Sequence, residues 1–441
     1  MVSVKNLYNI YEGDIIFMTD SDSILGMEAE KGRWALVFIG MVINLCLGSI
    51  YSWSIFVGPL LELFNDPAGL NLGVGRTEVL MPFTVFLAVF ALAMPLTGPY
   101  IEKFGPKKVT LVGGVLTALG WFLASTVTQF SNPVSMLYIM YSVVAGLGVG
   151  IAYGCPVAVA ARWFPDKRGT AVGFTVLGFG FSAVFTAALA NYFIASTGVL
   201  NTFRLFGIAF LIIIVVLSMP LTFPPAGWKP RGWTPPAPKP GAHVTVEFKR
   251  DQMVKSPQFL GLWLCYTIGC MAGLMAISVS KPVGTEVVMV EAGMATGLVS
   301  FFAIFNGFGR PIFGTLTDKI NPRNTAMASF VLIALASVMM YMAPSVPVYI
   351  IAFAILWGCL GGWLAIGPTS TATFFGTTDY ARNYGLVFTA YGAGAILGPM
   401  LAGYIRDATG SYMGVFPYII GVAIIGFAIA FVLMRPPKPP K

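Results

Sequence analysis

Arg310 places a full positive charge inside an apolar stretch, residues 293–316, that is long enough to cross a membrane. It lies eight residues before Asp318, which is about 12 Å along an α-helix, so it falls near the middle of the bilayer if Asp318 marks the membrane surface. An arginine at that depth costs at least about 2.5–3.5 kcal/mol, so we expect it to face a cavity or a partner. Its donor fork suits a carboxylate, and Asn306, one turn earlier, can add a hydrogen bond. The pair predicts a carboxylate-binding site.

The sequence offers Arg310 no acidic partner at its own depth. Every Asp and Glu from residue 31 onward falls in a loop or at the end of an apolar stretch. We therefore expect the anion to arrive from outside as a substrate. The alternative is that Arg310 bonds only to carbonyl groups at helix ends.

Five aromatic residues complete the candidate substrate-binding set. Tyr391 could donate a hydrogen bond to a carboxylate or a hydroxyl. Four others lie in stretches that could line a central cavity: Tyr51, Tyr153, Tyr266 and Trp363. The competing interpretation is that these aromatic residues pack between helices or anchor the chain at the membrane interface.

The elements that position these residues are predicted to be membrane-spanning helices. Of the 441 residues, 57% are hydrophobic and 10% are charged, far fewer than the roughly 25% charged residues of soluble domains. Apolar stretches of about 20 residues recur along the chain, and we predict an all-α membrane protein with twelve transmembrane helices. The predicted helices are residues 34–60, 79–99, 109–128, 135–161, 170–195, 204–223, 258–280, 293–316, 325–343, 346–369, 384–405 and 413–434.

The distribution of basic residues orients this chain. With the N-terminus in the cytoplasm, 21 of the 26 Lys and Arg residues fall in cytoplasmic segments and four in outer loops, as the positive-inside rule requires. The net charge of +8 then reflects the orientation of the chain in a membrane. We therefore expect a lipid bilayer as the environment and no nucleic-acid partner. We predict a multi-pass plasma-membrane protein with both termini in the cytoplasm. We also expect it to be a monomer.

Metal and cofactor chemistry is not expected. All five cysteines lie inside apolar stretches without metal-ligand spacing, and the one histidine, His243, lies in a proline-rich segment. No nucleophile and base are spaced for catalysis, so the sequence indicates no enzyme.

Two similar halves make up the chain. The proline-rich residues 224–257 are predicted to be a cytoplasmic linker between six-helix bundles at 34–223 and 258–434. Cytoplasmic tails are expected at 1–33 and 435–441. "GPYIEKFGPKKV", which begins at Gly98, aligns with "GTLTDKINPRNT", which begins at Gly314, at an offset of 216, and "FTVLGFG" aligns with "FTAYGAG" at 214. Parallel six-helix repeats are typical of transporters that bind substrate between their halves.

The duplicated loop predicts a cytoplasmic latch. An acid there can pair with a base or a helix N-terminus of the other bundle and hold the cytoplasmic face shut, unless the loop is only a solvated turn. The latch residues that we predict are Gly98, Glu102 and Lys103 in one half, Gly314, Asp318 and Lys319 in the other, and the paired bases Arg168 and Arg382.

This loop resembles the signature loop of the major facilitator superfamily, with Glu102 where aspartate is usual. Within that superfamily, "NLCLGSIYSWSIF", "SPQFLGLW" and "NYGLVFTAYGAGAILGP" resemble the oxalate/formate antiporter family, and "WFPDKRGTAVG" resembles related monocarboxylate transporters. The resemblance covers residues 31–434. It implies the major facilitator fold and a carboxylate-binding role for Arg310.

Two departures from these relatives bear on the substrate. The oxalate carrier supplies a second positive charge from a lysine where this chain has Tyr391, so one buried charge favours a monocarboxylate such as lactate, pyruvate or formate over oxalate. Animal monocarboxylate carriers have an aspartate where this chain has Asn306, so proton symport by that route is in doubt, and carboxylate exchange is the other coupling that we consider. The repeat counterpart of Arg310 is Met94, which makes the site asymmetric. An anion channel and a drug exporter are the rival functions.

Overall fold

The computed structural model describes residues 23–234 and 247–436. The first and last cytoplasmic tails, the middle of the predicted linker and His243 lie wholly or partly outside these residues. A two-residue antiparallel hairpin, β1 (Ser23–Ile24) with β2 (Met27–Glu28), precedes the first helix. The rest of the described chain is helical or forms the loops between helices.

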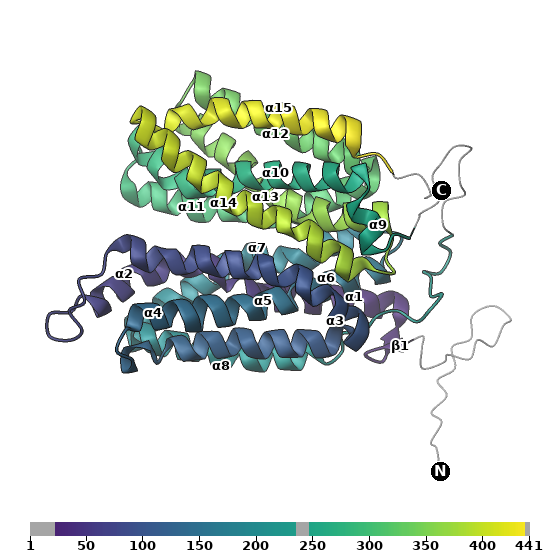
Figure 1. Cartoon of the computed structure of the whole chain (residues 1–441), viewed down its shortest axis with the longest axis horizontal. Coiled ribbons are helices and arrows are strands. Elements are labelled where there is room, and N and C mark those ends of the chain that lie inside the picture. Colours follow the sequence, from purple (N-terminus) through teal and green to yellow (C-terminus); the bar gives the residue numbers. More distant parts are fainter. Residues whose placement is uncertain (1–22, 235–246, 437–441) are drawn as a thin grey trace, which may run out of the picture.

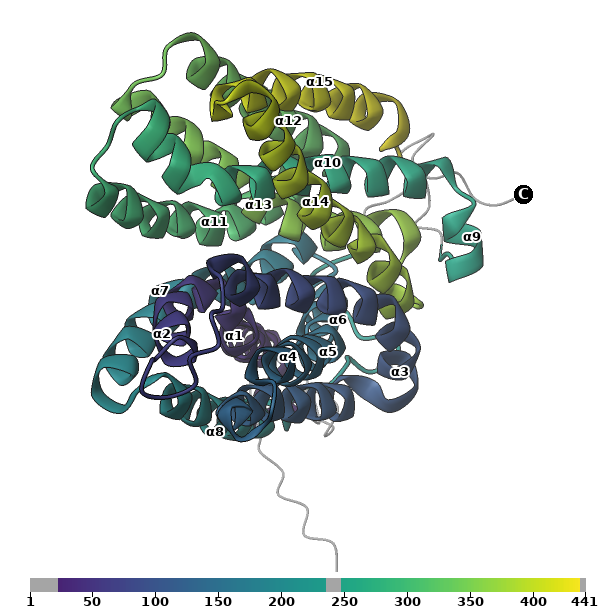
Figure 2. The ribbon, with the colours of Figure 1, turned by 60° about the vertical axis from the view of Figure 1, so that its left-hand side comes forward.

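Two groups of helices lie side by side in Figure 1, and Figure 2 separates them from another direction. We call α1 to α8 the N-half and α10 to α15 the C-half. The N-half contains α1 (Ala29–Leu47), the 3-10 segment η2 (Gly48–Ser52), α2 (Trp53–Phe64), α3 (Arg76–Ala124), η3 (Val127–Gln129), α4 (Pro133–Leu137), the π-helical η4 (Tyr138–Ala145), α5 (Gly146–Ala152), α6 (Gly154–Trp163), α7 (Arg168–Thr197) and α8 (Val199–Ser218).

The C-half follows the short helix α9 (Arg250–Val254). It contains α10 (Pro257–Pro282), the π-helical η5 (Val283–Val287), α11 (Ala292–Ile320), α12 (Pro322–Met342), α13 (Val346–Phe375), α14 (Tyr380–Thr409), η6 (Tyr412–Gly414) and α15 (Val415–Leu433). Across the boundary between the halves, α7 packs against α11 and α3 packs against α14.

The observed spans are consistent with the predicted twelve. Ten helical stretches in the described residues are long and apolar enough to cross a membrane. One of them covers α3, which is two helices joined at Gly105, where φ is 81° and ψ is 164°. Counting α3 twice and adding α11, whose Arg310, Asp318 and Lys319 reduce its apolar character, gives twelve.

The internal repeat is visible in the backbone. Asn321, 216 residues after Gly105, has nearly the same conformation, with φ of 73° and ψ of 160°. Few residues other than glycine adopt this region of the Ramachandran plot. Pro106 and Pro322 follow and begin the next helix in each half. The two loops therefore share a turn as well as a sequence pattern.

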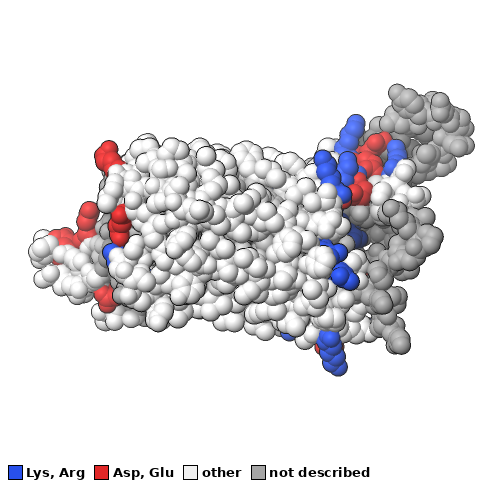
Figure 3. Space-filling view, turned by 90° about the horizontal axis from the view of Figure 1, so that it is seen from above, with Lys and Arg blue, Asp and Glu red and all other residues white. Residues whose placement is uncertain are grey.

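Charged side chains gather at the two ends of the molecule, and the long sides are almost free of them (Figure 3). Lys and Arg concentrate at the end where α9 lies, which we call the basic end. The end where α2 lies is the far end. The uncharged belt between them is what a bilayer requires of a helical bundle.

Candidate functional site

A cavity of about 690 Å³ lies between the two halves. Tyr51, Gly180 and Asn306 line its deep end, near the middle of the helices. Asn191 and Thr296 line it toward the far end, where both are exposed. The cavity therefore leads from the centre of the molecule toward the far end.

Arg310 lies directly behind the deep end of this cavity. Its side chain is fully buried on α11, with an exposed fraction of 0%. Nη1 donates to the carbonyl oxygen of Val176 on α7 at 2.7 Å, and Nη2 donates to Asn306 Oδ1 at 3.3 Å. The guanidinium carbon lies 5.6 Å from the centre of the Phe179 ring, within the range of a cation–π interaction. Arg310 thus connects α11 of the C-half to α7 of the N-half.

In the part of the chain that the structure describes, no carboxylate lies beside the charge of Arg310. Among the residues that the structure describes, only Arg33 and Arg310 are buried charged side chains. Arg33 is paired with Asp166 at 2.6 Å and with Glu30 at 2.9 Å. No such pair is present for Arg310, and within the described residues its Nε has no hydrogen-bond partner. A guanidinium has five N–H donors, so Arg310 keeps donors that its present partners do not use.

Glycines on α7 let this helix approach Arg310. A Cβ added to Gly180 would lie 2.8 Å from Arg310 Nε, and one added to Gly173 would lie 2.6 Å from the Arg310 carbonyl oxygen. These two glycines are seven residues apart and therefore lie on one face of α7. Gly180 makes room for the guanidinium, and Gly173 lets α7 approach the backbone of α11 at Arg310.

Tyr51 and Tyr391 connect the halves beside the cavity. Their hydroxyl oxygens lie 2.9 Å apart, and either can be the donor. Tyr51 comes from the 3-10 segment that interrupts the first span, at a point where a Cβ on Gly48 would collide with the backbone of Phe179. Tyr391 comes from α14 and is buried. The structure thus brings four of the predicted substrate-binding residues together: Arg310, Asn306, Tyr51 and Tyr391.

The other three predicted aromatic residues do not line the cavity. Tyr153 packs among the rings of Phe90, Phe179 and Phe388, at centroid distances of 5.3, 5.4 and 5.3 Å. Tyr266 stacks on Trp363 at 6.1 Å. All three are almost completely buried. Their hydroxyl and indole N–H groups have no hydrogen-bond partner within the described part of the chain.

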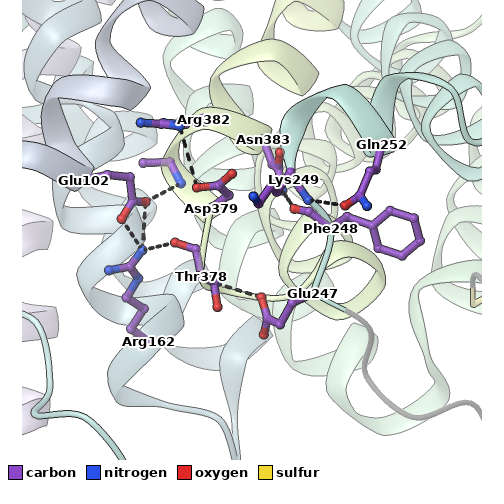
Figure 4. Close-up of polar contacts among 11 residues, drawn as sticks. Glu102, Arg162, Glu247, Phe248, Lys249, Gln252, Thr378, Asp379, Arg382 and Asn383 are labelled. Atoms are coloured by element: carbon purple, nitrogen blue, oxygen red, sulfur yellow. Dashed lines mark hydrogen bonds and ion pairs between the residues drawn. The ribbon is translucent and has the colours of Figure 1, made fainter. Parts of the chain in front are cut away.

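Glu102 provides the first contact of the predicted latch, at the basic end (Figure 4). Both carboxylate oxygens accept from Arg162 Nη2 at 2.7 Å, and Oε1 accepts from the backbone N–H of Ala381 at 3.2 Å. The same nitrogen of Arg162 donates to the Thr378 carbonyl oxygen at 3.1 Å. Ala381 is in the first turn of α14, where the helix dipole favours a negative charge. Glu102 and Arg162 of the N-half therefore hold the start of α14 in the C-half.

Asp318 makes the corresponding contact in the opposite direction. Its carboxylate accepts from the backbone N–H groups of Gly169 at 2.7 Å and Thr170 at 2.8 Å, and from the Thr170 hydroxyl at 2.8 Å. These groups form the first turn of α7. Asp318 of the C-half therefore holds the start of α7 in the N-half, without an arginine.

The two latch glycines allow this close approach. A Cβ on Gly98 would lie 2.6 Å from the Ala381 carbonyl oxygen, and one on Gly314 would collide with the carbonyl oxygen of Gly169. Gly98 and Gly314 are repeat mates, so each half presents a glycine to the helix start that its own acid holds.

The four basic residues of the predicted latch make different contacts. Arg168 crosses between the halves, because its Nη1 donates to the Ala372 carbonyl oxygen at 3.2 Å. Arg382 lies 4.0 Å from Asp379, three residues before it in the same half. Lys103 lies over the ring of neighbouring Phe104 at 5.2 Å, and Lys319 is exposed.

Sequence reasoning missed Arg162, Val176, Phe179 and Gly180. The aligned segment "FTVLGFG" contained three of these four residues, and its glycine spacing was the available signal for close helix packing. Arg162 carried no such signal, because it was one of many bases expected at the cytoplasmic surface.

Comparisons with known proteins agree with this fold. The family model described as Major Facilitator Superfamily matches residues 34–286 and 284–441. The chain is 30% identical over 416 residues to "Oxalate:formate antiporter" of Oxalobacter formigenes, with 93% of each chain covered. It is 24% identical to "Monocarboxylate transporter 14" of Mus musculus, with 91% of this chain and 90% of the relative covered. The solved structure of the proton:xylose symporter XylE is similar in fold, with a TM-score of 0.69 at 12% identity and coverage of 92% and 96%.

Proposed function

Because the chain belongs to the Major Facilitator Superfamily, we propose that it is a secondary transporter of small carboxylates, above all monocarboxylates of the lactate, pyruvate or formate class. One observation carries this proposal. Arg310 is fully buried directly behind the deep end of a cavity that Asn306 and Gly180 line, without a carboxylate partner among the described residues. An arriving carboxylate would neutralise the charge and could use both of its oxygens on the guanidinium.

The single charge favours a monocarboxylate. Tyr391, which binds the Tyr51 hydroxyl, provides hydrogen bonding but no second cation. A dicarboxylate would leave one negative charge without a partner at this depth, which is costly in a low-dielectric site. Oxalate remains the alternative substrate, because the relative that is 30% identical is an oxalate:formate antiporter.

Alternating access accounts for the two ends of the molecule. Glu102 and Asp318 each hold a helix start of the other half at the basic end, while the cavity leads to the far end. Breaking these latch contacts would let the halves rock about the site and expose Arg310 to the basic end. In this proposal the basic end is cytoplasmic, as the positive-inside rule favours, and the chain is a monomer in the plasma membrane.

Exchange and proton symport both fit this site. An empty carrier must reorient with the Arg310 charge unpaired, whereas a loaded carrier reorients with the charge neutralised, which favours exchange of one carboxylate for another. Proton symport is the other coupling that we consider, in which a proton travels together with the substrate. Asn306 cannot carry that proton, because its amide does not titrate near neutral pH.

Counterflow into proteoliposomes tests the proposal. Purified protein is reconstituted, vesicles are loaded with unlabelled lactate, formate or oxalate, and uptake of the labelled anion is followed. We expect saturable uptake that is fastest for a monocarboxylate and much faster into loaded than into empty vesicles. Uptake that does not saturate and is indifferent to loading would indicate an anion channel, and equal rates into loaded and empty vesicles would argue against exchange.

A further inference from the structure

The end of the linker between the two halves is bonded to the loop that the cytoplasmic latch holds. This loop, residues 376–379, joins α13 to α14. The carboxylate of Glu247 accepts from the backbone N–H groups of Thr377 at 3.3 Å and Thr378 at 2.9 Å (Figure 4). A Cβ on Gly376 would collide with that carboxylate. Gly376 therefore leaves the space that the Glu247 carboxylate occupies, and a larger residue at position 376 would fill it.

Phe248 fixes the same linker end to the helices on both sides of the loop. Its backbone N–H donates to the Phe375 carbonyl oxygen at 2.9 Å, and its carbonyl oxygen accepts from Asn383 Nδ2 at 2.9 Å. Its ring lies 5.7 Å from that of Phe375. Phe375 ends α13 and Asn383 is in the first turn of α14, so Phe248 is held independently of Glu247.

Thr378 links these contacts to the latch. Its N–H donates to Glu247 of the linker, and its carbonyl oxygen accepts from Arg162 of the N-half. Arg162 in turn is paired with Glu102. The two bonds fix Thr378 from both sides: Glu247 holds its N–H where Arg162 can bind its carbonyl oxygen.

We propose that Glu247 is a positioning residue of the cytoplasmic gate, which holds the loop 376–379 where Arg162 and Glu102 can bind it and so favours the state closed at the basic end. Glu247 is far from the carboxylate site, and the proposal rests on alternating access but not on the identity of the substrate. In the state open at the basic end, Arg162 leaves the loop, so only the closed state needs the loop in this position.

The linker does not act as a short tether. Its beginning is fixed to the N-half, where the Arg231 N–H donates to Glu30 at 2.7 Å and Trp228 packs on Trp163 at 4.7 Å. Fifteen residues separate Arg231 from Glu247, and a chain of that length can reach about 50 Å. The linker acts on the gate through the bonds of Glu247.

Distances between spin labels on the two halves test this inference. Labels at Lys108→Cys and Asn324→Cys, both exposed at the basic end, report how far the halves separate there. The native cysteines are all buried, which leaves the introduced ones accessible. Pulsed electron spin resonance of the reconstituted full chain, without substrate, then gives the populations of the closed and open states.

Glu247→Ala frees the loop in both states, but only the closed state must order it again to bind Arg162. The ratio of open to closed states should therefore rise about fivefold, the order of change expected when the backbone of about one residue has to be ordered. Glu247→Gln keeps one acceptor oxygen and should give a smaller increase. Asp251→Asn, which removes an exposed acid four residues away on α9, should leave the ratio unchanged. If Glu247→Ala does not yield folded protein, Glu247→Gln alone decides.

An unchanged ratio in the folded Glu247 variants, or an equal increase with Asp251→Asn, would overturn the proposal. Because no substrate is present, this result is separate from the substrate assignment. If Glu247→Ala favours the open state but the parent protein transports no carboxylate, the gate inference stands and the proposed substrate is refuted.

Discussion

The hydroxyl groups of Tyr51 and Tyr391 lie 2.9 Å apart and join the two halves of the chain beside the buried guanidinium of Arg310. Tyr51 lines the central cavity, and Tyr391 of the opposite half is bonded to the Tyr51 hydroxyl. A substrate that binds Arg310 would therefore meet a polar group from each half. Substitution at Tyr391 alters the charge of the site at the position where a second cation would suit a dianion.

Tyr391→Lys should shift the preference of the carrier toward oxalate. The added ammonium gives a dicarboxylate a second partner, but it repels Arg310 when the site is empty or holds a monocarboxylate. We expect the uptake ratio of oxalate to lactate to rise by about tenfold, which corresponds to roughly 1.4 kcal/mol of discrimination. Counterflow with both labelled anions measures the ratio.

Tyr391→Phe is the matched control, because it removes the hydroxyl without adding charge. It should weaken transport of both anions and leave their ratio unchanged. A folded Tyr391→Lys protein with the parental ratio would show that charge count at this site does not select the substrate.

Arg310→Ala should abolish transport without unfolding the protein. The loss of the cation removes the carboxylate partner, and we expect uptake to fall by at least about 100-fold, as for other truncations that break a buried charge pair. Stability should stay the same or increase, because an uncompensated buried charge is costly to the folded state. Arg310→Lys keeps the charge but loses the planar fork, and it should retain only a small part of the activity. Uptake and thermal unfolding measured on the same preparations separate the two effects.

Arg33→Ala is the control for burial of an arginine. Arg33 is paired with Asp166 and Glu30, so its removal takes the ion-pair partner from both acids and should lower the unfolding temperature. Arg310→Ala that unfolds as readily as Arg33→Ala would mean that the bond to Val176 is structural and that the site needs no anion.

The latch and the central arginine could be predicted because each has a local signature. Glu102 and Asp318 occur in loops that repeat at one offset, and helix N-termini are the natural partners of such acids. Arg310 is conspicuous because the apolar residues around it leave a charge without explanation. In both cases the prediction depends on a few residues that are neighbours in the sequence.

Partners that depend on tertiary arrangement could not be predicted. Arg162 and Glu247 are two charges among several at the basic end, and their selection depends on how the halves dock. Phe179 and Gly180 could not be singled out in the sequence, because the chain has 35 Phe and 50 Gly. The rotation of each helix about its axis determines whether an aromatic residue faces the cavity, which is why Tyr51 lines it and Tyr153 does not.

Glu102→Gln and Asp318→Asn should each favour opening at the basic end. Glu102→Gln breaks an ion pair with Arg162 and weakens the bond from Ala381, whereas Asp318→Asn weakens three hydrogen bonds from Gly169 and Thr170. We expect the ratio of open to closed states to rise about threefold to tenfold in each variant. The labels at Lys108→Cys and Asn324→Cys measure it.

The double variant tests whether the two latches act independently. They hold different helices, so their effects on the free energy of opening should add. Glu62→Gln, an exposed acid on α2 at the far end, is the control and should leave the ratio unchanged. If Glu62→Gln raises the ratio as much as either latch variant, the opening results from a general loss of negative charge.

Asn321→Gly should stabilise the folded chain. Asn321 has φ of 73° and ψ of 160°, a conformation that costs a residue with a side chain on the order of 1–3 kcal/mol. Its repeat mate Gly105 adopts nearly the same angles without that cost. The exchange loses the cap in which the Asn324 N–H donates to Asn321 Oδ1, and it adds flexibility to the unfolded chain; together these cost about 1 kcal/mol. We expect a net gain of up to about 2 kcal/mol, and Gly105→Ala, which introduces the strain in the other half, should lose about 1–3 kcal/mol. Thermal unfolding in detergent compares the three proteins, and a Gly105→Ala variant as stable as the parent would contradict the requirement for this backbone conformation in the repeated loop.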